Sequence, residues 1–521
     1  MTEACSMIVS IPKFDERHYL ETNPAAKSAI RFGTAKSALD HYLHIGIDEN
    51  RYSLVRREPA LLSAVIERFL VSQSGFCLLI GWIGDEGCDQ PRLRLVGGEF
   101  SVELSAEATF RIARRDVEAH IKSGAFDYGF VAFGRSPSRS LLKQSLLFQV
   151  TASGGAFQTK LTPEIVSDKR LLDTLLEIVA TCEAHAGREC ALNSFLSGMA
   201  GETAIALFRS HVNSATSDHY VERFGERSVT HSLITVLFGS SEPMLVQPLL
   251  FRSANIDFGE WIYVCNSPED AEAMLRYGRL MSDLYDVMIT VIVMGDNAGF
   301  GAANNLAIDY AASDRIFVIN PDVYPLPTHA APLQQVLTEA DLGTTLWGGL
   351  LFYDDDNLMH SGMYIDRDVF VRRNSLNRLS GPGVGVPQCG LLRVEHYDKG
   401  VPFEERLWQA PKEVPAISGA VMAFDKRRFQ AIDGFSTRYI YGHYEDADLS
   451  LRWGREGGDV AVHPLIRLVH LEGQGSRARG EQYRGAAIAN RHFFTARHGE
   501  FFQQNRARLA KSRELLPAVA S

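Results

Sequence analysis

The sequence predicts an α/β fold built on an open β-sheet for the C-terminal half of the chain. The first observation is residues 288–323, where apolar runs at 289–293 and 316–319 flank a stretch with the apolar spacing of a helix. Apolar runs without alternation are typical of strands buried on both faces. The second observation is that similar runs at 233–238 and 261–265 come earlier and also end in polar turns. Strands that alternate with helices in this way indicate an open α/β sheet.

The turn after the run at 289–293 is rich in glycine and asparagine, and two interpretations are open. Gly299 and Gly301 begin a pattern close to the dinucleotide fingerprint, with Asp322 at the distance of a ribose carboxylate, which predicts a nicotinamide oxidoreductase. The third glycine of that fingerprint is replaced by Asn304. The other interpretation takes the whole string from Asn297 together with Asp322, a carboxylate at the carboxyl end of a strand, where open sheets bind ligands.

The remaining chain changes character several times, which predicts further domains. Short strand-like runs separated by glycine-containing turns between about 74 and 155 indicate a small antiparallel sandwich. Leucines with helical spacing after residue 161 indicate helices. The predicted organisation is a helical module at 1–58, a β-sandwich-like domain at 59–160, a helical linker at 161–228, the α/β domain at 229–476 and a helical C-terminal extension at 477–521.

Composition restricts the partners and the compartment. The 521 residues are 45% hydrophobic and 22% charged, as in ordinary globular proteins, and the net charge of -10 argues against a nucleic-acid partner. The seven cysteines are scattered and form no CxxC pair, which favours a reducing cytoplasm over a disulfide framework. No apolar run reaches the length of a membrane span, and the N-terminus has no signal pattern, so we expect a cytoplasmic protein.

Three later strings decide between the interpretations. They are Val-Pro-Ala-Ile-Ser-Gly-Ala at 414–420, Tyr-Glu-Asp-Ala-Asp-Leu-Ser-Leu-Arg at 444–452, and the histidine at 470. In this order, and after the central stretch, they resemble the family 2 inverting glycosyltransferases, in the branch with bacterial rhamnosyltransferases, here with extra N-terminal domains. The resemblance covers roughly residues 230–476. It implies a GT-A fold, the Rossmann-like mixed sheet of nucleotide-diphospho-sugar transferases.

The resemblance implies an activity, a donor and a metal. The expected reaction transfers a hexosyl or deoxyhexosyl group from a nucleoside-diphosphate sugar to a glycan or lipid-linked acceptor with inversion, in bacterial surface polysaccharide synthesis. Mn²⁺ or Mg²⁺ is the expected cofactor because the diphosphate leaving group needs neutralising, and Asp322 and His470 are the candidate ligands. The expected nucleotide-sugar-binding residues are Asn266, Asn297, Gly299, Asn304, Asp322, Ser418 and Gly419.

The acceptor hydroxyl needs a carboxylate base opposite the leaving group. Asp446 is the candidate, with Glu445 as the alternative, and both stand at a predicted helix start with Asp448. Repulsion among the three acids is expected to raise the pKa of at least one of them. Asp448 and Arg452, four residues apart, are expected to form an ion pair on that helix.

The sequence leaves two questions open, namely whether the chain is catalytic and what its C-terminal extension contacts. The single aspartate of the metal motif, and Cys265 and Asn266 at a strand end where the family often has an aspartate, also suit a non-catalytic glycan-binding protein with a degenerate transferase domain. The C-terminal extension is rich in arginine and phenylalanine. It either forms a basic amphipathic helix that places the protein peripherally at the inner face of the membrane, or it packs its aromatic residues on the domain and leaves its arginines in solvent.

Overall fold

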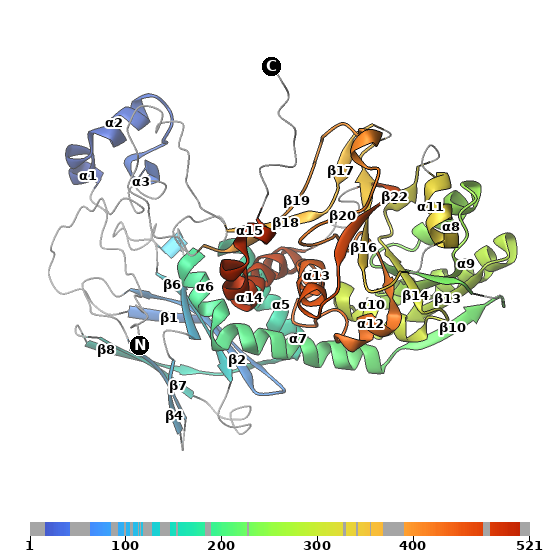
Figure 1. Ribbon diagram of the computed structural model, residues 1–521. Coiled ribbons are helices and arrows are strands. Elements are labelled where there is room, and N and C mark those ends of the chain that lie inside the picture. Colours follow the sequence, from blue (N-terminus) through green and yellow to red (C-terminus); the bar gives the residue numbers. More distant parts are fainter. Residues whose placement is uncertain are drawn as a thin grey trace. The chain divides into compact units, whose positions relative to one another are not determined.

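The computed structural model describes residues 16–41, 63–84, 92–97, 100–104, 108–112, 114, 116–117, 128–135, 146–152, 155–182, 189–226, 229–326, 330–339, 342–354, 356–367, 390–471 and 480–510 (Figure 1). The chain divides into two compact units. The first contains residues 1–207 and 369–390, and the second contains residues 208–368 and 391–521.

The first unit begins with three short helices around one buried tyrosine. They are α1 (Glu16–Thr22), α2 (Pro24–Arg31) and α3 (Ala38–His41). The hydroxyl of Tyr19 lies 2.9 Å from Nδ1 of His41, and both side chains are buried. Apolar contacts from Ala26 and Ala38 complete this small core.

Two sheets follow in the first unit. One has the order β5-β6-β2-β1-β9 and the other β4-β3-β7-β8. Their strands are β1 (Ser63–Ser72), β2 (Phe76–Gly84), β3 (Arg92–Gly97), β4 (Phe100–Leu104), β5 (Thr109–Ile112), β6 (Gly129–Arg135), β7 (Leu146–Ala152), β8 (Gly155–Leu161) and β9 (Glu164–Val166). Phe130 of β6 stacks on Phe148 of β7 with ring centroids 5.7 Å apart, so residues of both sheets share one core, as in a sandwich.

Helices carry the chain from the sheets towards the second unit. They are α5 (Asp168–Cys182), α6 (Glu189–Ser197) and α7 (Met199–Ser217), and α7 crosses the division between the units. The leucines at 171, 172, 175 and 176 are all buried on α5, as their helical spacing predicts.

The second unit is built on a mixed sheet with the order β10-β13-β12-β11-β14-β21-β16-β22-β15, with β17 and β20 paired beside it. Its strands are β10 (Tyr220–Phe224), β11 (His231–Leu237), β12 (Gly259–Cys265), β13 (Met288–Val293), β14 (Arg315–Ile319), β15 (Val323–Pro325), β16 (Leu346–Phe352), β17 (Leu358–His360), β20 (Lys412–Glu413), β21 (Val421–Asp425) and β22 (Val460–His470). The first of these, β10, comes from the segment expected to be a helical linker, and it pairs antiparallel with β13.

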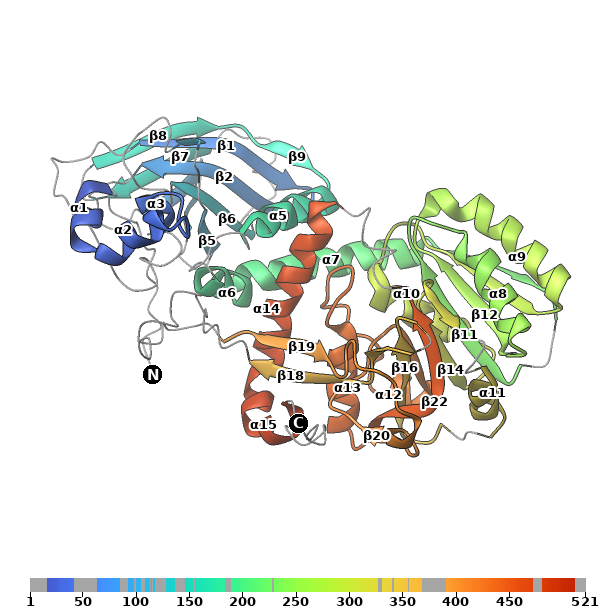
Figure 2. The ribbon, with the colours of Figure 1, turned by 90° about the horizontal axis from the view of Figure 1, so that it is seen from above.

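The sheet has a parallel centre, as the apolar runs predict. Strands β13, β12, β11 and β14 are parallel neighbours, and the burial of almost every residue explains why their sequences do not alternate. The connecting helices are α8 (Pro243–Ser253), α9 (Ala271–Tyr285) and α10 (Gly299–Tyr310). Helices α8 and α9 lie side by side (Figure 2), whereas α10 packs on β11 and β12.

The strand order places a switch point between β11 and β14. The chain moves from β11 outwards to β12 and β13 and then returns past them to β14. Because crossovers between parallel strands are right-handed, the outward and returning helices cover opposite faces of the sheet. The carboxyl ends of β11 and β14 therefore border the position where open α/β sheets bind ligands.

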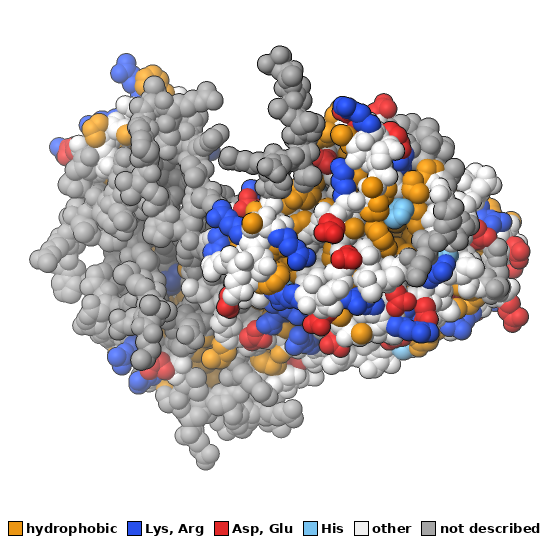
Figure 3. Space-filling model, viewed as in Figure 1, with side chains coloured by type: hydrophobic (Ala, Val, Ile, Leu, Met, Phe, Trp, Pro, Cys, Tyr) orange, Lys and Arg blue, Asp and Glu red, His pale blue; other side chains and the backbone are white. Residues whose placement is uncertain are grey.

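A second core joins the C-terminal helices to a hairpin. Its elements are β18 (Met363–Arg367), β19 (Leu392–His396), α13 (Glu445–Arg455), α14 (Glu481–Gln504) and α15 (Arg506–Leu509). Helix α12 (Lys426–Ala431) packs on β21, and α11 (Ala330–Glu339) packs on β22. Phe494 and Phe502 of α14 are buried in this core with Ile365 and Leu451. On the face of the second unit seen in Figure 3, basic and acidic side chains are interspersed.

Candidate functional site

Several predicted site residues lie at the carboxyl edge of the parallel strands. Asn266 follows β12, Asn297 follows the end of β13, and Asp322 follows β14. The three strands end at the same edge because they run in parallel. The topology alone therefore brings these side chains to one region of the second unit.

Asn266 and Asn297 are nearly buried and build the turn between β13 and α10. The amide nitrogen of the Asn266 side chain donates to Oδ1 of Asn297 over 2.8 Å, and Oδ1 of Asn266 accepts from the Ala298 amide. Oδ1 of Asn297 also accepts from the Gly299 amide, and Nδ2 of Asn297 donates to the Tyr483 hydroxyl. Both side chains thus shape the turn, and a direct contact with a nucleotide stays a prediction.

The start of α10 is closed by protein groups. Gly299 has a φ of +77°, and a Cβ there would lie 2.8 Å from Cα of Tyr441, so only glycine fits without strain. The Phe300 amide donates to the Tyr441 carbonyl over 2.7 Å. Asn304 is fully buried, and its Nδ2 donates to the Phe300 carbonyl. The predicted helix thus begins at Gly299, and its first amides already have acceptors.

Asp322 and His470 face each other. Val323 pairs with His470 between β15 and β22, and the Asp322 carbonyl accepts from the Leu471 amide. Oδ1 of Asp322 lies 3.2 Å from Nε2 of His470, and only 16% and 12% of the two side chains are exposed. Sequence residues almost 150 positions apart are brought together by this strand pairing alone.

The turn that carries Asp322 is held by a glutamine that the sequence analysis missed. Nε2 of Gln247, a fully buried side chain on α8, donates to the carbonyls of Asn320 and Val323, on either side of Asp322. A glutamine in a helix has no local signal for such a role. This role depends on the fold, which brings the turn after β14 next to α8.

The pair of Asp322 and His470 fits a divalent metal as two neighbouring ligands. Ligands about 2.1 Å from one ion at a right angle lie about 3 Å apart, close to the observed separation. No group of three or more His, Cys, Asp or Glu side chains in the described part of the chain could enclose an ion. Further oxygen ligands would therefore come from donor phosphates and water, as is common for Mg²⁺.

Ser418 and Gly419 connect the Asp322 turn to the predicted base. Asn320, two residues before Asp322, donates its amide to the Ala420 carbonyl over 3.0 Å. The neighbouring Gly419 amide donates to Oδ2 of Asp446 over 2.9 Å. The turn that leads into Asp322 and the carboxylate of Asp446 therefore both contact one short backbone segment.

The predicted acidic helix start is present. Helix α13 carries Glu445, Asp446 and Asp448 in its first turn, and Glu445 and Asp448 are buried. The predicted ion pair is confirmed, because Nε of Arg452 lies 2.7 Å from Oδ2 of Asp448. Tyr444 just before the helix has a φ of +73°, which is unusual for a residue other than glycine.

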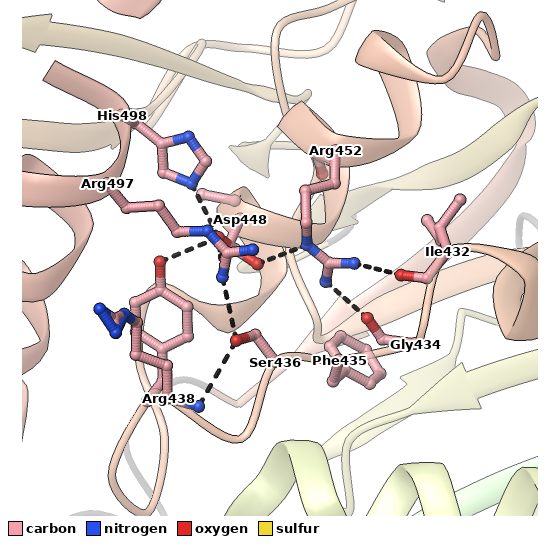
Figure 4. Close-up of polar contacts among 12 residues, drawn as sticks. Ile432, Gly434, Phe435, Ser436, Arg438, Asp448, Arg452, Arg497 and His498 are labelled. Atoms are coloured by element: carbon pink, nitrogen blue, oxygen red, sulfur yellow. Dashed lines mark hydrogen bonds and ion pairs between the residues drawn. The ribbon is translucent and has the colours of Figure 1, made fainter. Parts of the chain in front are cut away.

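Asp448 anchors α13 rather than facing a ligand (Figure 4). It is fully buried and accepts from Arg452, from Nε2 of His498, from the Tyr439 hydroxyl and, at 3.1 Å, from Arg497. Burial alone raises the pKa of Asp448, but the hydrogen bond from His498 and the two arginine charges lower it to about 2. The expected rise of the pKa of at least one of the three acids therefore does not fall on Asp448, because the cationic side chains and the hydrogen bond outweigh its burial.

The Arg452 side chain extends this anchor to the preceding loop. Its two terminal nitrogens donate to the carbonyls of Ile432 and Gly434, and Arg497 donates to the Ser436 hydroxyl (Figure 4). Burial lowers the pKa of His498, although its hydrogen bond to Asp448 acts in the opposite direction. This network joins α13, α14 and the loop at 432–436.

The C-terminal helix contributes to the site region instead of standing apart. Phe493, Phe494 and Phe502 are buried, as the packing interpretation expects, and Tyr483 contacts the rings of Phe238 and Tyr441. Contact with a membrane through the basic segment stays a prediction. Within the described residues, no helix is long and apolar enough to cross a membrane.

Comparison with protein families gives one match. Residues 402–472 match the family model described as the N-terminal domain of galactosyltransferase, so the second unit contains a glycosyltransferase-like domain. This segment holds the predicted site residues Ser418, Gly419, Glu445, Asp446 and His470. No curated protein matches the chain.

Solved structures give more distant likenesses. A structure of GalNAc-T7 with UDP, GalNAc and Mn²⁺ is 13% identical, covers 55% of each chain and has a TM-score of 0.34. The mannosyltransferase PcManGT of Pyrobaculum calidifontis with GDP-Man and Mn²⁺ is 12% identical, covers 65% of this chain and 89% of its own, and has a TM-score of 0.31. TarS 1-349 of S. aureus is 13% identical, with coverages of 55% and 76% and a TM-score of 0.30.

Proposed function

We propose that this protein is a metal-dependent inverting glycosyltransferase that uses a nucleoside-diphosphate sugar. The observation that carries the proposal is that the 418–420 segment contacts both the Asp446 carboxylate and the turn that leads into Asp322 at the end of β14. The glycosyltransferase-like match over residues 402–472 supports it, because the matched segment contains the proposed base Asp446 and the proposed metal ligand His470. In this proposal, Asp322 binds the metal that neutralises the leaving diphosphate, and Asp446 takes the proton of the acceptor hydroxyl.

Asp446 is the proposed base. As the acceptor hydroxyl oxygen bonds to the anomeric carbon, Asp446 takes its proton, and the bond from that carbon to the diphosphate oxygen breaks, which inverts the configuration. The amides of Gly419 and Ala447 each donate to one oxygen of Asp446 and fix its plane. Each oxygen keeps a further lone pair for the incoming proton. Glu445 remains the alternative base.

Asp322 and His470 are the proposed ligands of Mn²⁺ or Mg²⁺. The ion, when bound, neutralises the charge of the departing diphosphate. Gln247 keeps the carboxylate of Asp322 in place by holding both ends of its turn. Ser418 and Gly419 are proposed to bind the donor sugar through the backbone; the missing side chain of Gly419 makes room for the Phe300 ring, which a Cβ would meet at 3.2 Å.

The start of α10 disfavours the oxidoreductase interpretation. A dinucleotide pyrophosphate needs free backbone amides at a helix start. Here the amides of Ala298, Gly299 and Phe300 donate to Asn266, Asn297 and Tyr441. Gly299 of the glycine pattern is therefore needed because the Tyr441 backbone packs closely against it.

The finer assignments of the proposal rest on the sequence resemblance. They are membership of the rhamnosyltransferase-like branch, transfer of a hexosyl or deoxyhexosyl group to a glycan or lipid-linked acceptor, and a role in bacterial surface polysaccharide synthesis. A cytoplasmic location is part of the proposal. Cys265, which is buried and forms no disulfide, is compatible with a reducing compartment.

A donor panel tests the proposal. Release of sugar from UDP-, GDP- and dTDP-sugars is measured with Mn²⁺, with Mg²⁺ and with EDTA. We expect one donor to be used, metal to be required, and both Asp322→Ala and Asp446→Asn to lower transfer at least about a thousandfold while the protein stays folded. Asp425→Asn, at the start of α12 and outside the site, is the matched control. Full activity of both site variants would refute the assignment, and glycan binding without transfer or nucleotide dependence would favour the glycan-binding alternative.

A further inference from the structure

The loop that leads into the predicted base has an unfavourable backbone. Tyr441, His443 and Tyr444 have φ values of 59°, 79° and 73°, in the left-handed region that residues other than glycine rarely adopt. Three such residues directly precede Glu445 and Asp446. A conformation of this kind persists only where the surroundings hold it.

One buried side chain contacts this loop at four points. Oδ1 of Asn490, on α14, accepts from the Ile440 amide over 2.8 Å. Its Nδ2 donates to the carbonyls of Ile440, Gly442 and His443, at 3.0, 2.6 and 3.3 Å. Asn490 has no exposed surface, so no water replaces these bonds. A side chain must both donate and accept to make this set, which an amide does and a carboxylate does not.

The helix that carries Asn490 is itself fixed on both sides of this residue. Before it, the Tyr483 hydroxyl accepts from Asn297, and the Tyr483 ring packs on Tyr441. After it, His498 donates to Asp448 of α13. Helix α14 is thus held against the β13–α10 turn and against α13 (Figures 1 and 2), and Asn490 lies between these contacts.

We propose that Asn490 is a positioning residue for sugar transfer, which holds the 440–444 loop so that Asp446 faces the acceptor. This inference rests on the proposed function. It adds to the site a helix that lies outside the segment matched by the glycosyltransferase-like family. Asn490 does not touch donor or acceptor in this scheme, so its effect falls on the orientation of the base and not on donor binding.

The test compares variants in the full chain. Asn490→Ala removes all four bonds, and Asn490→Asp keeps the volume and the bond from the Ile440 amide but removes the donors. Thr495→Val is the matched control, because Thr495 lies on the same helix and its hydroxyl accepts from the Leu392 amide of β19, away from the loop. The measurements are kcat and KM of transfer, donor binding by calorimetry, and hydrogen exchange of residues 440–448.

We expect both Asn490 variants to lower kcat about a hundredfold, as for a displaced catalytic group, with the dissociation constant of the donor within about threefold of the wild type. Thr495→Val should retain kcat within about threefold. Should Asn490→Ala not fold, Asn490→Asp carries the test.

A kcat of the Asn490 variants equal to that of Thr495→Val, or a parallel loss of donor binding and kcat, would overturn the inference. A wild-type protein that transfers no sugar would refute the proposed function instead. The hydrogen-exchange measurement does not require activity. Unchanged exchange of residues 440–448 in the Asn490 variants would by itself refute the proposal that Asn490 holds the 440–444 loop.

Discussion

Replacing Asp448 by asparagine should destabilise the second unit more than any other single loss of an acid that we consider. The carboxylate is fully buried and receives hydrogen bonds from Arg452, His498 and Tyr439 at 2.7, 2.7 and 3.0 Å. Asparagine keeps the shape but offers one oxygen and a donor group, which then faces another donor. It also leaves Arg452, with a side chain only 14% exposed, without its counter-charge.

The magnitude follows from two routes. Removing one partner of a buried ion pair costs about 3–5 kcal/mol. The pKa of Asp448 falls from 3.8 to about 2, and at 1.36 kcal/mol per pH unit this alone corresponds to about 2 kcal/mol. We therefore expect the free energy of unfolding of the second unit to fall by about 3 kcal/mol in Asp448→Asn.

The assay is urea unfolding followed by tryptophan fluorescence, because four of the five tryptophans lie in the second unit. Asp425→Asn is the control: Asp425 caps α12 by accepting from the Arg428 amide, and asparagine caps equally well, so its loss should stay below about 0.5 kcal/mol. A loss below about 1 kcal/mol for Asp448→Asn would refute the reasoning, since the buried carboxylate would then not be the anchor.

The same experiment has a pH dependence with a definite sign. The folded pKa of Asp448 lies below its unfolded value, so the stabilisation is complete above about pH 4 and is lost as the pH falls towards 2. The stability difference between the wild type and Asp448→Asn should therefore shrink between pH 5 and pH 3. A difference that is constant over this range would contradict the assignment of the low pKa.

Two further predictions concern the sheet edge. Gly299→Ala should cost about 2–4 kcal/mol of stability, because the new Cβ meets the Tyr441 backbone. Gly457→Ala is the control: Gly457 has a φ of +74° but open space around it, so the loss should be only about 1 kcal/mol. Equal melting temperatures of the two variants would contradict the close approach of Tyr441 to Gly299. Gln247→Leu should weaken metal-dependent donor binding about tenfold by releasing the turn of Asp322, measured by calorimetry with and without EDTA, and unchanged binding would exclude this role.

The central strand–helix–strand unit could be predicted because its signals are local. Runs buried on both faces produce continuous apolar sequences, so β13 and β14 lie where the pattern placed them. The start of α10 is harder to predict. Gly299 has the residue type of a loop, and its place in the helix depends on the close packing of the Tyr441 backbone. The approach of Asp322 to His470 follows from pairing of β15 with β22, which no local pattern encodes.

The roles of Gln247 and Asn490 could not be predicted for a different reason. Both are amide side chains within helices, and their partners are backbone carbonyls, which look the same at every residue. A sequence pattern identifies the acids of α13 by their type and spacing. It does not identify the side chain that holds the loop leading into this helix. For the same reason, the sequence of the C-terminal segment predicts only a membrane-contacting or packing helix.

The late position of α14 in the chain has a consequence for biosynthesis. Domains emerge and fold from the N-terminal side as the ribosome proceeds. The parallel strands and the acids of α13 are made well before residue 490, so during translation the 441–444 loop exists without its partner. We expect nascent chains arrested before α14 to contain the sheet but to show faster exchange at this loop. Completion of α14 would then set the moment at which this loop and the second core take their final form, and termination before α14 would leave both incomplete.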